Sequence, residues 1–360
     1  MGAEQAIRDV EQAAMLAGEG GRMKVVVAGG TGVLGQRICS EVRSVSPDAE
    51  LLIGTRRVGG AAGLARDLGP PARSVPLDVR DPASIRRVAD GADVVIVAVA
   101  QDAPLVQQVC LDLGVHSVDV GVGADVAEQV RAMDRQAVDA GLAAVAMAGL
   151  FPGLSGLLVR EVVGGLDTIE SVDVFFRQHT NARVGRAGTT DMLRIVSTPV
   201  RRGTSVVRGF LRGSHAEPGS RLIEHPERSI MTSALGPARV DYWTRWNSRT
   251  FDAVVATLVA VRALPRFASQ IARLTRHDPD IPENVELRVL GRGALAGRPA
   301  EQVVTLSALS DYGATAGVAV ALSMLAVRRK ITGAGVPFAL TTLDEVLAAM
   351  RDGLVTVRGG

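Results

Sequence analysis

The chain has 360 residues and a formal net charge of +2, with 47% hydrophobic and 22% charged residues. These values are ordinary for a folded globular protein, and the near-neutral charge argues against a nucleic-acid-coating surface. Cys39 and Cys110 fall in apolar helical patterns and form no CxxC pair. They predict buried thiols and argue against a metal site or a disulfide framework.

Residues 1–22 are expected to form an extension before the first domain. They lack the basic start and the apolar segment of a signal peptide. The most hydrophobic stretch, residues 251–274, is interrupted by Arg262, Pro265 and Arg266, so it does not suit a membrane span. We therefore expect a cytoplasmic protein without a membrane span.

Between residues 23 and 152, short runs rich in Val, Ile and Ala alternate with amphipathic stretches. Strands that are apolar on both faces and alternate with helices predict a doubly wound parallel (Rossmann) sheet. The predicted strands lie at 23–29, 49–56, 72–79, 92–100, 115–121 and 142–150. The predicted helices lie at 36–44, 60–69, 82–90, 103–114 and 124–141.

The pattern changes after residue 152, which predicts a second, α+β domain. An alternating strand is expected at 169–180, followed by a polar stretch at 181–188, and two long strands joined by a Gly-rich turn at 285–309. Helices are expected at 154–166, 190–196, 251–276, 314–330 and 342–353. The predicted parts are an extension (1–22), a Rossmann domain (23–152), an inserted substrate and dimerisation domain (153–312) and C-terminal helices that return to the Rossmann domain (313–360).

The first strand runs into a glycine-rich turn that opens a helix. Gly30-x-Gly32-x-x-Gly35 fits the dinucleotide fingerprint, and Gly29 adds an overlapping frame. Glycines at these positions allow a tight turn and a close approach of the backbone to a pyrophosphate, which then faces the helix N-terminus. The predicted contacts are Gly29, Gly30, Thr31, Gly32, Val33, Leu34 and Gly35.

The end of the second strand indicates which dinucleotide binds. An NAD site usually has Asp or Glu there, whereas this chain has Thr55, Arg56 and Arg57. A guanidinium pairs with the 2′-phosphate that a carboxylate would repel, so we predict NADP(H). The ends of the third and fourth strands complete the predicted cofactor site with Asp78, Val79, Ala98, Val99 and Ala100.

The group that transfers a proton is harder to identify. Neither Tyr242 nor Tyr312 has the Lys four residues later that a short-chain dehydrogenase needs, and the sequence has no zinc-ligand cluster and no Gly-x-Ser-x-Gly. Asp119 ends the fifth strand, in the crevice where such sheets bind ligands, although it also suits a helix cap. His179 and Asp191 flank the polar stretch that could cover the nicotinamide. We take Asp119 and His179 as the catalytic candidates.

Four segments resemble the saccharopine dehydrogenase-like family of reductases: "GGTGVLGQRI", "DPASIRRVADGADVVIVAVA", "GVHSVDVG" and "AVAMAGLFPGLSGLLVRE". The resemblance covers roughly residues 23–350 and is loose between 180 and 280. It implies a Rossmann domain, an inserted α+β domain that binds substrate and often dimerises, and NAD(P)-linked chemistry. Some members form or oxidise a secondary amine through an imine, and others act on lipid or polyketide substrates.

The loop "GLFPG" departs from the amino-acid-handling members of that family, which tend to carry a polar residue where this chain has Phe151. We therefore predict an apolar substrate pocket with contacts from Phe151, Pro152, Gly153 and Phe176. Aromatic residues that could extend this pocket, or form ordinary core instead, are Phe175, Trp243 and Trp246. The histidines expected at the surface are His215, His225 and His277. The arginines considered for an anionic substrate group are Arg177, Arg183 and Arg186, each more simply a surface residue.

These features predict an NADP(H)-dependent oxidoreductase that reduces a C=N, C=O or C=C bond of a small, largely apolar metabolite in a biosynthetic tailoring step. The expected partners are a small-molecule substrate and a second copy of the chain in a homodimer; no nucleic acid and no metal is expected. The alternative is a non-catalytic, NADP(H)-sensing regulator, because the first domain also resembles NmrA-like proteins.

Overall fold

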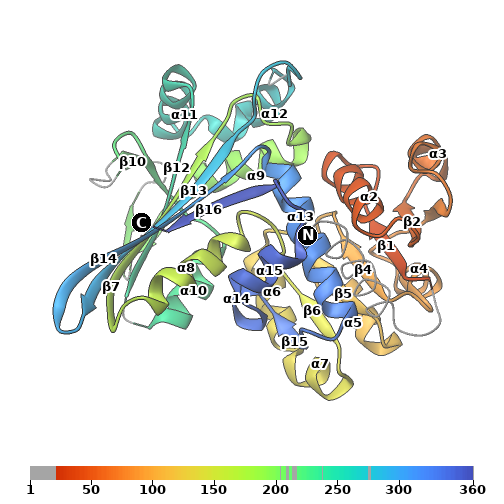
Figure 1. Ribbon diagram of the computed structural model, residues 1–360. Helices are drawn as coiled ribbons and strands as arrows, with labels where there is room; N and C mark the ends of the chain where they lie inside the picture. The colour runs from red at the N-terminus through yellow and green to blue at the C-terminus, as the bar shows by residue number, and fades with distance from the viewer. Residues whose placement is uncertain are drawn as a thin grey trace, which may run out of the picture.

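The computed structural model describes residues 22–202, 204–207, 211–212, 217–236, 238–274 and 277–359. It contains two large sheets, one built from the red-to-yellow first part of the chain together with the blue strand β15, and one from later strands that run from yellow-green to blue (Figure 1). Residues 1–21 and His215 lie outside the described residues, so the expectations for the extension and for His215 stay predictions.

The first sheet has seven parallel strands in the order β15-β6-β5-β4-β1-β2-β3. This order reverses direction between β1 and β4, as in a doubly wound nucleotide-binding sheet. The six expected strands are confirmed, whereas β15 is an addition that its sequence, Gly-Ala-Gly, does not suggest. The strands span Lys24–Ala28 (β1), Glu50–Thr55 (β2), Ala72–Pro76 (β3), Val94–Val97 (β4), His116–Asp119 (β5), Ala143–Val145 (β6) and Gly333–Gly335 (β15).

Helices cover both faces of this sheet because its strands are apolar on both sides. Val25 and Val27 of β1 pack in the cluster that contains α2, whereas Val26 and Ala28 pack in the cluster that contains α4 and α5. The helix expected from residue 36 already begins at Val33. The helices of this region span Val33–Val45 (α2), Val58–Ala61 (η1), Ala62–Leu68 (α3), Pro82–Ala89 (α4), Leu105–Leu113 (α5), Ala124–Arg131 (α6) and Asp134–Ala140 (α7). Cys39 and Cys110 are buried free thiols, as predicted.

The second sheet is mixed and has the order β10-β11-β12-β7-β13-β14-β16. The expected strand β7 and the expected hairpin of β13 and β14 form its centre, with β12 parallel to β7. The strands span Thr168–Gln178 (β7), Leu211–Arg212 (β10), Arg221–Ile223 (β11), Arg239–Trp246 (β12), Val285–Leu295 (β13), Arg298–Ala308 (β14) and Val355–Gly359 (β16). A separate antiparallel pair spans Val200–Arg202 (β8) and Ser205–Val207 (β9).

The helices of the second domain differ from the prediction at one point that concerns the site. The helix expected at 190–196 begins at Gly185, so half of the polar stretch 181–188 is helical; its glycines suggested a loop, but Gly188 lies inside the helix. The expected helical region 251–276 is two helices. The helices span Leu154–Gly164 (α8), Gly185–Ser197 (α9), Glu227–Leu235 (α10), Arg249–Ala260 (α11) and Leu264–Leu274 (α12).

The C-terminal part of the chain contacts both sheets. The long, buried helix α13 (Asp311–Val327) packs on α2, β4 and β5, and the short helices α14 (Pro337–Leu340) and α15 (Leu343–Ala349) contact α8. The chain then returns to the second sheet as β16, which pairs with β14. We keep the boundaries 23–152, 153–312 and 313–360 as a proposal, with β16 as the strand of the last part that joins the second domain.

Candidate functional site

The glycine-rich turn after β1 is packed so tightly that it admits no side chains at two of its glycines. Gly29 has φ +81, and a Cβ on it would lie 2.8 Å from the carbonyl oxygen of Ala98. A Cβ on Gly35 would lie 2.2 Å from the carbonyl oxygen of Gly29. The turn therefore presents bare backbone at the carboxyl edge of the sheet, next to the loop after β4.

The N-terminus of α2 is open to an anion. Its N-cap is Gly32, no side chain caps it, and its first turn contains no acidic residue. The N–H groups of Val33, Leu34 and Gly35 have no intrahelical partner by position, and the helix dipole favours negative charge there. Thr31 precedes this cap. The turn and the helix together have the form of a pyrophosphate cradle.

The end of β2 presents two cationic side chains. The Thr55 hydroxyl oxygen accepts a hydrogen bond from the backbone N–H of Arg57 at 3.3 Å, which fixes the turn. The side chains of Arg56 and Arg57 are exposed and make no ion pair with any residue that the structure describes. Two guanidinium groups and no carboxylate at this position suit a 2′-phosphate.

The ends of β3 and β4 lie along the same edge. The Asp78 carboxylate accepts a hydrogen bond from the backbone N–H of Arg80, and the backbone N–H of Asp78 donates to Ser84, so this turn is fixed. Val79 follows it and is partly buried. The loop formed by Ala98, Val99 and Ala100 lies against Gly29 through its first two residues.

Asp119, the first catalytic candidate, is buried at the end of β5 and engaged by its own surroundings. Its carboxylate accepts hydrogen bonds from Gln101 Nε2 at 2.8 Å, Gln107 Nε2 at 2.9 Å and the Gly121 N–H at 2.7 Å. Burial raises its pKa, and these hydrogen bonds act against that rise. The carboxylate thereby braces the loops after β4 and β5, and its catalytic role stays a prediction.

His179, the second candidate, lies just after β7. Its Nδ1 accepts a hydrogen bond from the Asn181 N–H at 3.1 Å, and its Nε2 lies 2.8 Å from Asn247 Nδ2. Both ring nitrogens therefore have a partner within the second domain, where the ring links the end of β7 to the end of β12. Its catalytic role also stays a prediction.

Helices α9 and α13 border the crevice. A Cβ on Gly185, at the start of α9, would lie 3.0 Å from Val33 of the glycine-rich turn. One turn later, a Cβ on Gly188 would lie 2.1 Å from the hydroxyl of Tyr312. The first turn of α13 is itself fixed to the loop after β6, because Thr315 Oγ1 accepts a hydrogen bond from the Leu150 N–H at 3.2 Å. Tyr312 thus lies against α9, on a helix that Thr315 fixes to the loop after β6.

The charges around Tyr312 favour its neutral form. Burial, together with nearby Asp311 and Asp191, raises the pKa of Tyr312 far above its ordinary value of 10.0. The hydroxyl makes no hydrogen bond to another residue within the described ranges. Burial and nearby Glu283 raise the pKa of Asp311 to about 6. A neutral tyrosine therefore lies beside a carboxyl group that titrates close to neutral pH.

The loop Phe151-Pro152-Gly153 forms an aromatic wall with the second domain. The Phe151 ring is partly exposed and lies 4.6 Å from the Phe176 ring and 3.9 Å from the His225 ring, measured between centroids. His225 in turn stacks on Tyr242 at 4.6 Å. Phe151 and Phe176 are therefore brought together as predicted.

One expectation about this wall is wrong, and for Phe175 and Trp243 the alternative of ordinary core holds. His225 is buried, not at the surface; burial lowers its pKa to about 3, and neither ring nitrogen has a hydrogen-bond partner in the described part of the chain. The aromatic residues also do not form one pocket, because side chains alternate along a strand. Phe175 and Trp243 pack on the opposite face of the second sheet, where Trp243 Nε1 donates to Asp173. His277 is exposed, as expected.

Glu227 lies behind the aromatic wall and is almost fully buried. Its carboxylate accepts hydrogen bonds from the Ser155 hydroxyl at 2.6 Å, the Tyr242 hydroxyl at 3.0 Å and the Gly153 N–H at 3.1 Å. Burial raises its pKa, and these donors act against that rise. The carboxylate fixes the loop after β6 to β12 and caps the first turn of α8.

Residues 25–145 match the family model of the saccharopine dehydrogenase NADP binding domain. The first domain of this chain is thus an NADP-binding domain of the saccharopine dehydrogenase type, and the protein is an NADP-dependent oxidoreductase. The matched residues include the glycine-rich turn, the arginines after β2 and Asp119, and the tight turn with its open helix N-terminus fits the cofactor. The expectations of this family, of NADP(H) and of an oxidoreductase are confirmed.

Solved structures support the fold of this oxidoreductase. Apo saccharopine dehydrogenase (L-Glu forming) from Saccharomyces cerevisiae superposes with a TM-score of 0.68 at 13% identity, covering 94% of this chain and 100% of that chain. The DAP dehydrogenase from C. glutamicum, in complex with DAP, superposes with a TM-score of 0.50 at 15% identity, covering 92% and 99%. No curated protein sequence matches the chain.

Two further findings concern the described residues alone. No group of three or more metal-ligating side chains comes together among them. None of their helices combines the length and the apolarity that crossing a membrane requires.

The sequence analysis missed several residues of this oxidoreductase's site. Tyr312 was examined only for a Lys four residues on, His225 was assigned to the surface, and Glu227 was not considered. Several of their partners lie far away in the sequence, as for Gly153 and Glu227 (separation 74). The one local signal was the burial pattern of "RLIEHPE", in which His225 follows an apolar strand.

Proposed function

We propose that this oxidoreductase uses NADPH to reduce a C=N, C=O or C=C bond of a small, largely apolar metabolite. The observation that carries the proposal is the neutral aromatic wall made by Phe151, Phe176 and His225. A histidine whose pKa is about 3 stays uncharged at physiological pH, so it offers no cation to a substrate carboxylate. The wall therefore favours apolar substrate surface over the charged ends of a free amino acid.

The buried carboxylate behind the wall supports the same reading. Glu227 is bonded to Tyr242 of the ring stack, and its oxygens already accept from Gly153, Ser155 and Tyr242. An ammonium group would have to compete with these donors inside a nearly dry environment, which is unfavourable. The predicted substrate contacts Phe151, Pro152, Gly153 and Phe176 belong to this proposal.

Tyr312 is the residue that we assign to proton transfer. NADPH supplies the hydride when it is bound. The Tyr312 hydroxyl keeps its proton because burial and the neighbouring carboxylates oppose ionisation, and no described group holds that proton in a hydrogen bond. It can therefore donate to the substrate atom next to the reduced carbon, and Asp311 is the adjacent acid that can return a proton.

The test is NADPH oxidation against a panel of apolar imines, ketones and enoyl compounds, with free amino and keto acids as the contrasting set. We expect turnover with a member of the apolar set. Tyr312→Phe should then lower the turnover number by about 100-fold or more while NADPH binding stays intact. Turnover confined to amino or keto acids would contradict the apolar pocket. Tight NADPH binding without turnover of any compound would instead favour an NADP(H)-sensing role.

The same assay compares the three candidate proton donors. His179→Gln and Asp119→Asn disturb groups that hold loops, so we expect smaller losses of turnover and some loss of thermal stability. If His179→Gln loses turnover and Tyr312→Phe does not, His179 and not Tyr312 would be the proton donor.

The biological setting also stays a proposal. Assembly as a homodimer through the second domain, a place in a biosynthetic tailoring step and a cytoplasmic location rest on the family resemblance and on the sequence. Size-exclusion chromatography with light scattering tests the dimer, and genome neighbours of the encoding gene test the tailoring step.

A further inference from the structure

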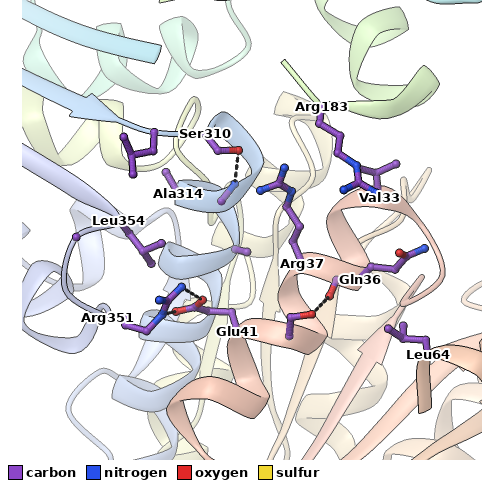
Figure 2. A pocket seen from close by; sticks show the side chains of 15 residues that line it. Val33, Gln36, Arg37, Glu41, Leu64, Arg183, Ser310, Ala314, Arg351 and Leu354 are labelled. Atoms are coloured by element: carbon purple, nitrogen blue, oxygen red, sulfur yellow. Dashed lines mark hydrogen bonds and ion pairs between the residues drawn. The ribbon is translucent and has the colours of Figure 1, made fainter. Parts of the chain in front are cut away.

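Arg183 extends from the second domain to the cofactor domain. It lies two residues before α9, and Figure 2 shows its side chain reaching over Val33, the first residue of α2. Both residues line a cavity of about 420 Å³ between α2 and the start of α13. The guanidinium is therefore directed towards the helix terminus that forms the pyrophosphate cradle.

Arg183 differs from the other cations of this cavity in having no ion-pair partner. Arg37 binds Glu283 at 2.9 Å and Arg351 binds Glu41 at 3.0 Å. Within the described residues, the Arg183 guanidinium makes neither an ion pair nor a hydrogen bond, and the residue is exposed. Its charge remains available to a bound anion.

The backbone at Arg183 is held against α2 by a bridging carboxylate. Glu283 accepts a hydrogen bond from the Arg183 N–H at 2.6 Å and from the Arg37 guanidinium at 2.9 Å. Two residues earlier, the buried Asn181 makes three hydrogen bonds of 2.7–2.8 Å to the backbone of Asp278 and Ile281. The position from which Arg183 extends is thus fixed before any ligand binds, which lowers the entropic cost of using it.

We propose that Arg183 binds the pyrophosphate of NADP(H), so that the second domain closes one side of the cofactor site. The backbone N–H groups at the start of α2 supply donors to the phosphates but no full positive charge. Arg56 and Arg57 follow β2, the position that suits a 2′-phosphate. Arg37 of α2, the first-domain cation of this cavity, is already paired with Glu283. Arg183 provides that cation from the second domain.

The experiment measures binding, so it does not depend on an identified substrate. Wild type and Arg183→Gln are titrated with NADPH, NADH and 2′-AMP, which lacks the pyrophosphate, and Arg186→Gln is the matched control from the same segment. We expect Arg183→Gln to weaken NADPH and NADH by similar factors, on the order of ten-fold to a hundred-fold, and to leave 2′-AMP unchanged. Arg183→Lys should recover part of the loss, and Arg186→Gln should behave as wild type.

Three results would overturn the inference. Unchanged NADPH affinity in Arg183→Gln would mean that the guanidinium contacts no part of the cofactor. A loss restricted to NADPH and 2′-AMP would place it at the 2′-phosphate instead. An equal loss of cofactor affinity in Arg186→Gln would mean that the effect comes from the overall positive charge of this surface and not from a contact of Arg183. The inference rests on the cofactor site and not on the proposed substrate: a protein that binds NADPH through Arg183 but reduces nothing in the panel would refute only the proposed function.

Discussion

The cofactor half of the crevice and the half that we propose for the substrate are built in different ways. The cofactor half uses consecutive residues: the turn from Gly29 to Gly35 supplies bare backbone, and Arg56 and Arg57 supply charge. The substrate half uses side chains from separate elements, such as Phe151 after β6 and His225 before α10. The first half is set by local geometry, and the second exists only when the two domains are folded together.

This difference predicts how each half responds to mutation. A change in the turn acts through the backbone and should damage both the fold and cofactor binding. A change in the aromatic wall or beside Tyr312 alters hydrogen bonds and charges, so its effect should depend on the partner and on pH. The variants below test this contrast from the largest expected effect to the smallest.

The largest effect is expected for Gly35→Ala. Its Cβ would lie 2.2 Å from the Gly29 carbonyl oxygen and 2.8 Å from Gly30 Cα, and neither is the end of a flexible side chain. We expect the free energy of unfolding to fall by about 3 kcal/mol, with loss of NADPH binding, as measured by urea denaturation and fluorescence titration. The control is Gly63→Ala within α3, where a Cβ meets nothing within 4 Å; it should gain about 0.5–1 kcal/mol. If the two variants had the same stability and the same affinity for NADPH, the close packing of the turn around Gly35 would be contradicted.

Glu227→Gln should cost about 2–3 kcal/mol of stability. The carboxylate accepts from Ser155, Tyr242 and Gly153, whereas an amide directs its NH₂ group at one set of these donors. Thermal and urea unfolding measure the loss, with Glu161→Gln on the exposed side of α8 as a control expected to stay near wild type. A stability change below about 0.5 kcal/mol would show that the network is not formed.

Asp311→Asn should have a smaller effect, and its sign depends on pH. The pKa of Asp311 is about 6 in the folded protein against an ordinary 3.8, so the folded state favours the protonated form. The stability that this adds is fully present below pH 3.8 and is lost as the pH rises through about 6. The neutral variant should therefore exceed wild type by about 1–2 kcal/mol at pH 8 and match it near pH 4. A variant that is less stable than wild type at pH 8 would mean that the folded protein stabilises the charged form of Asp311 and does not disfavour it.

Much of the first domain could be predicted from the sequence, because its strands are continuous apolar runs and its motif is local. The second domain was predicted less completely. The hairpin of β13 and β14 shows clear alternation, but β11 of this domain is three residues long and gains its stability from its neighbours in the sheet. The same holds for β15, the added strand of the first sheet. The start of α9 was missed because Gly185 and Gly188 look like loop residues, although they are small to fit Val33 and Tyr312.

Within the site, residue type alone does not predict where a side chain lies or what it binds. His225 stands between Glu224 and Pro226, which suggested the surface, yet the Phe151 and Tyr242 rings cover it. Asp119 and His179 were chosen for their chemistry, and their hydrogen bonds to neighbouring side chains and backbone could not be seen from sequence spacing. A pattern of consecutive residues thus predicts the cofactor contacts, whereas contacts between distant segments decide the rest.

The most direct test of the account is a titration of the purified protein with NADPH and with NADH, repeated for Arg56→Ala and Arg57→Ala. Each lost phosphate contact should weaken NADPH by about 1–3 kcal/mol and leave NADH nearly unchanged. Tight NADPH binding that weakens selectively in these variants is the predicted result. Preference for NADH, or equal losses for both cofactors, would contradict the assignment of the end of β2 to the 2′-phosphate.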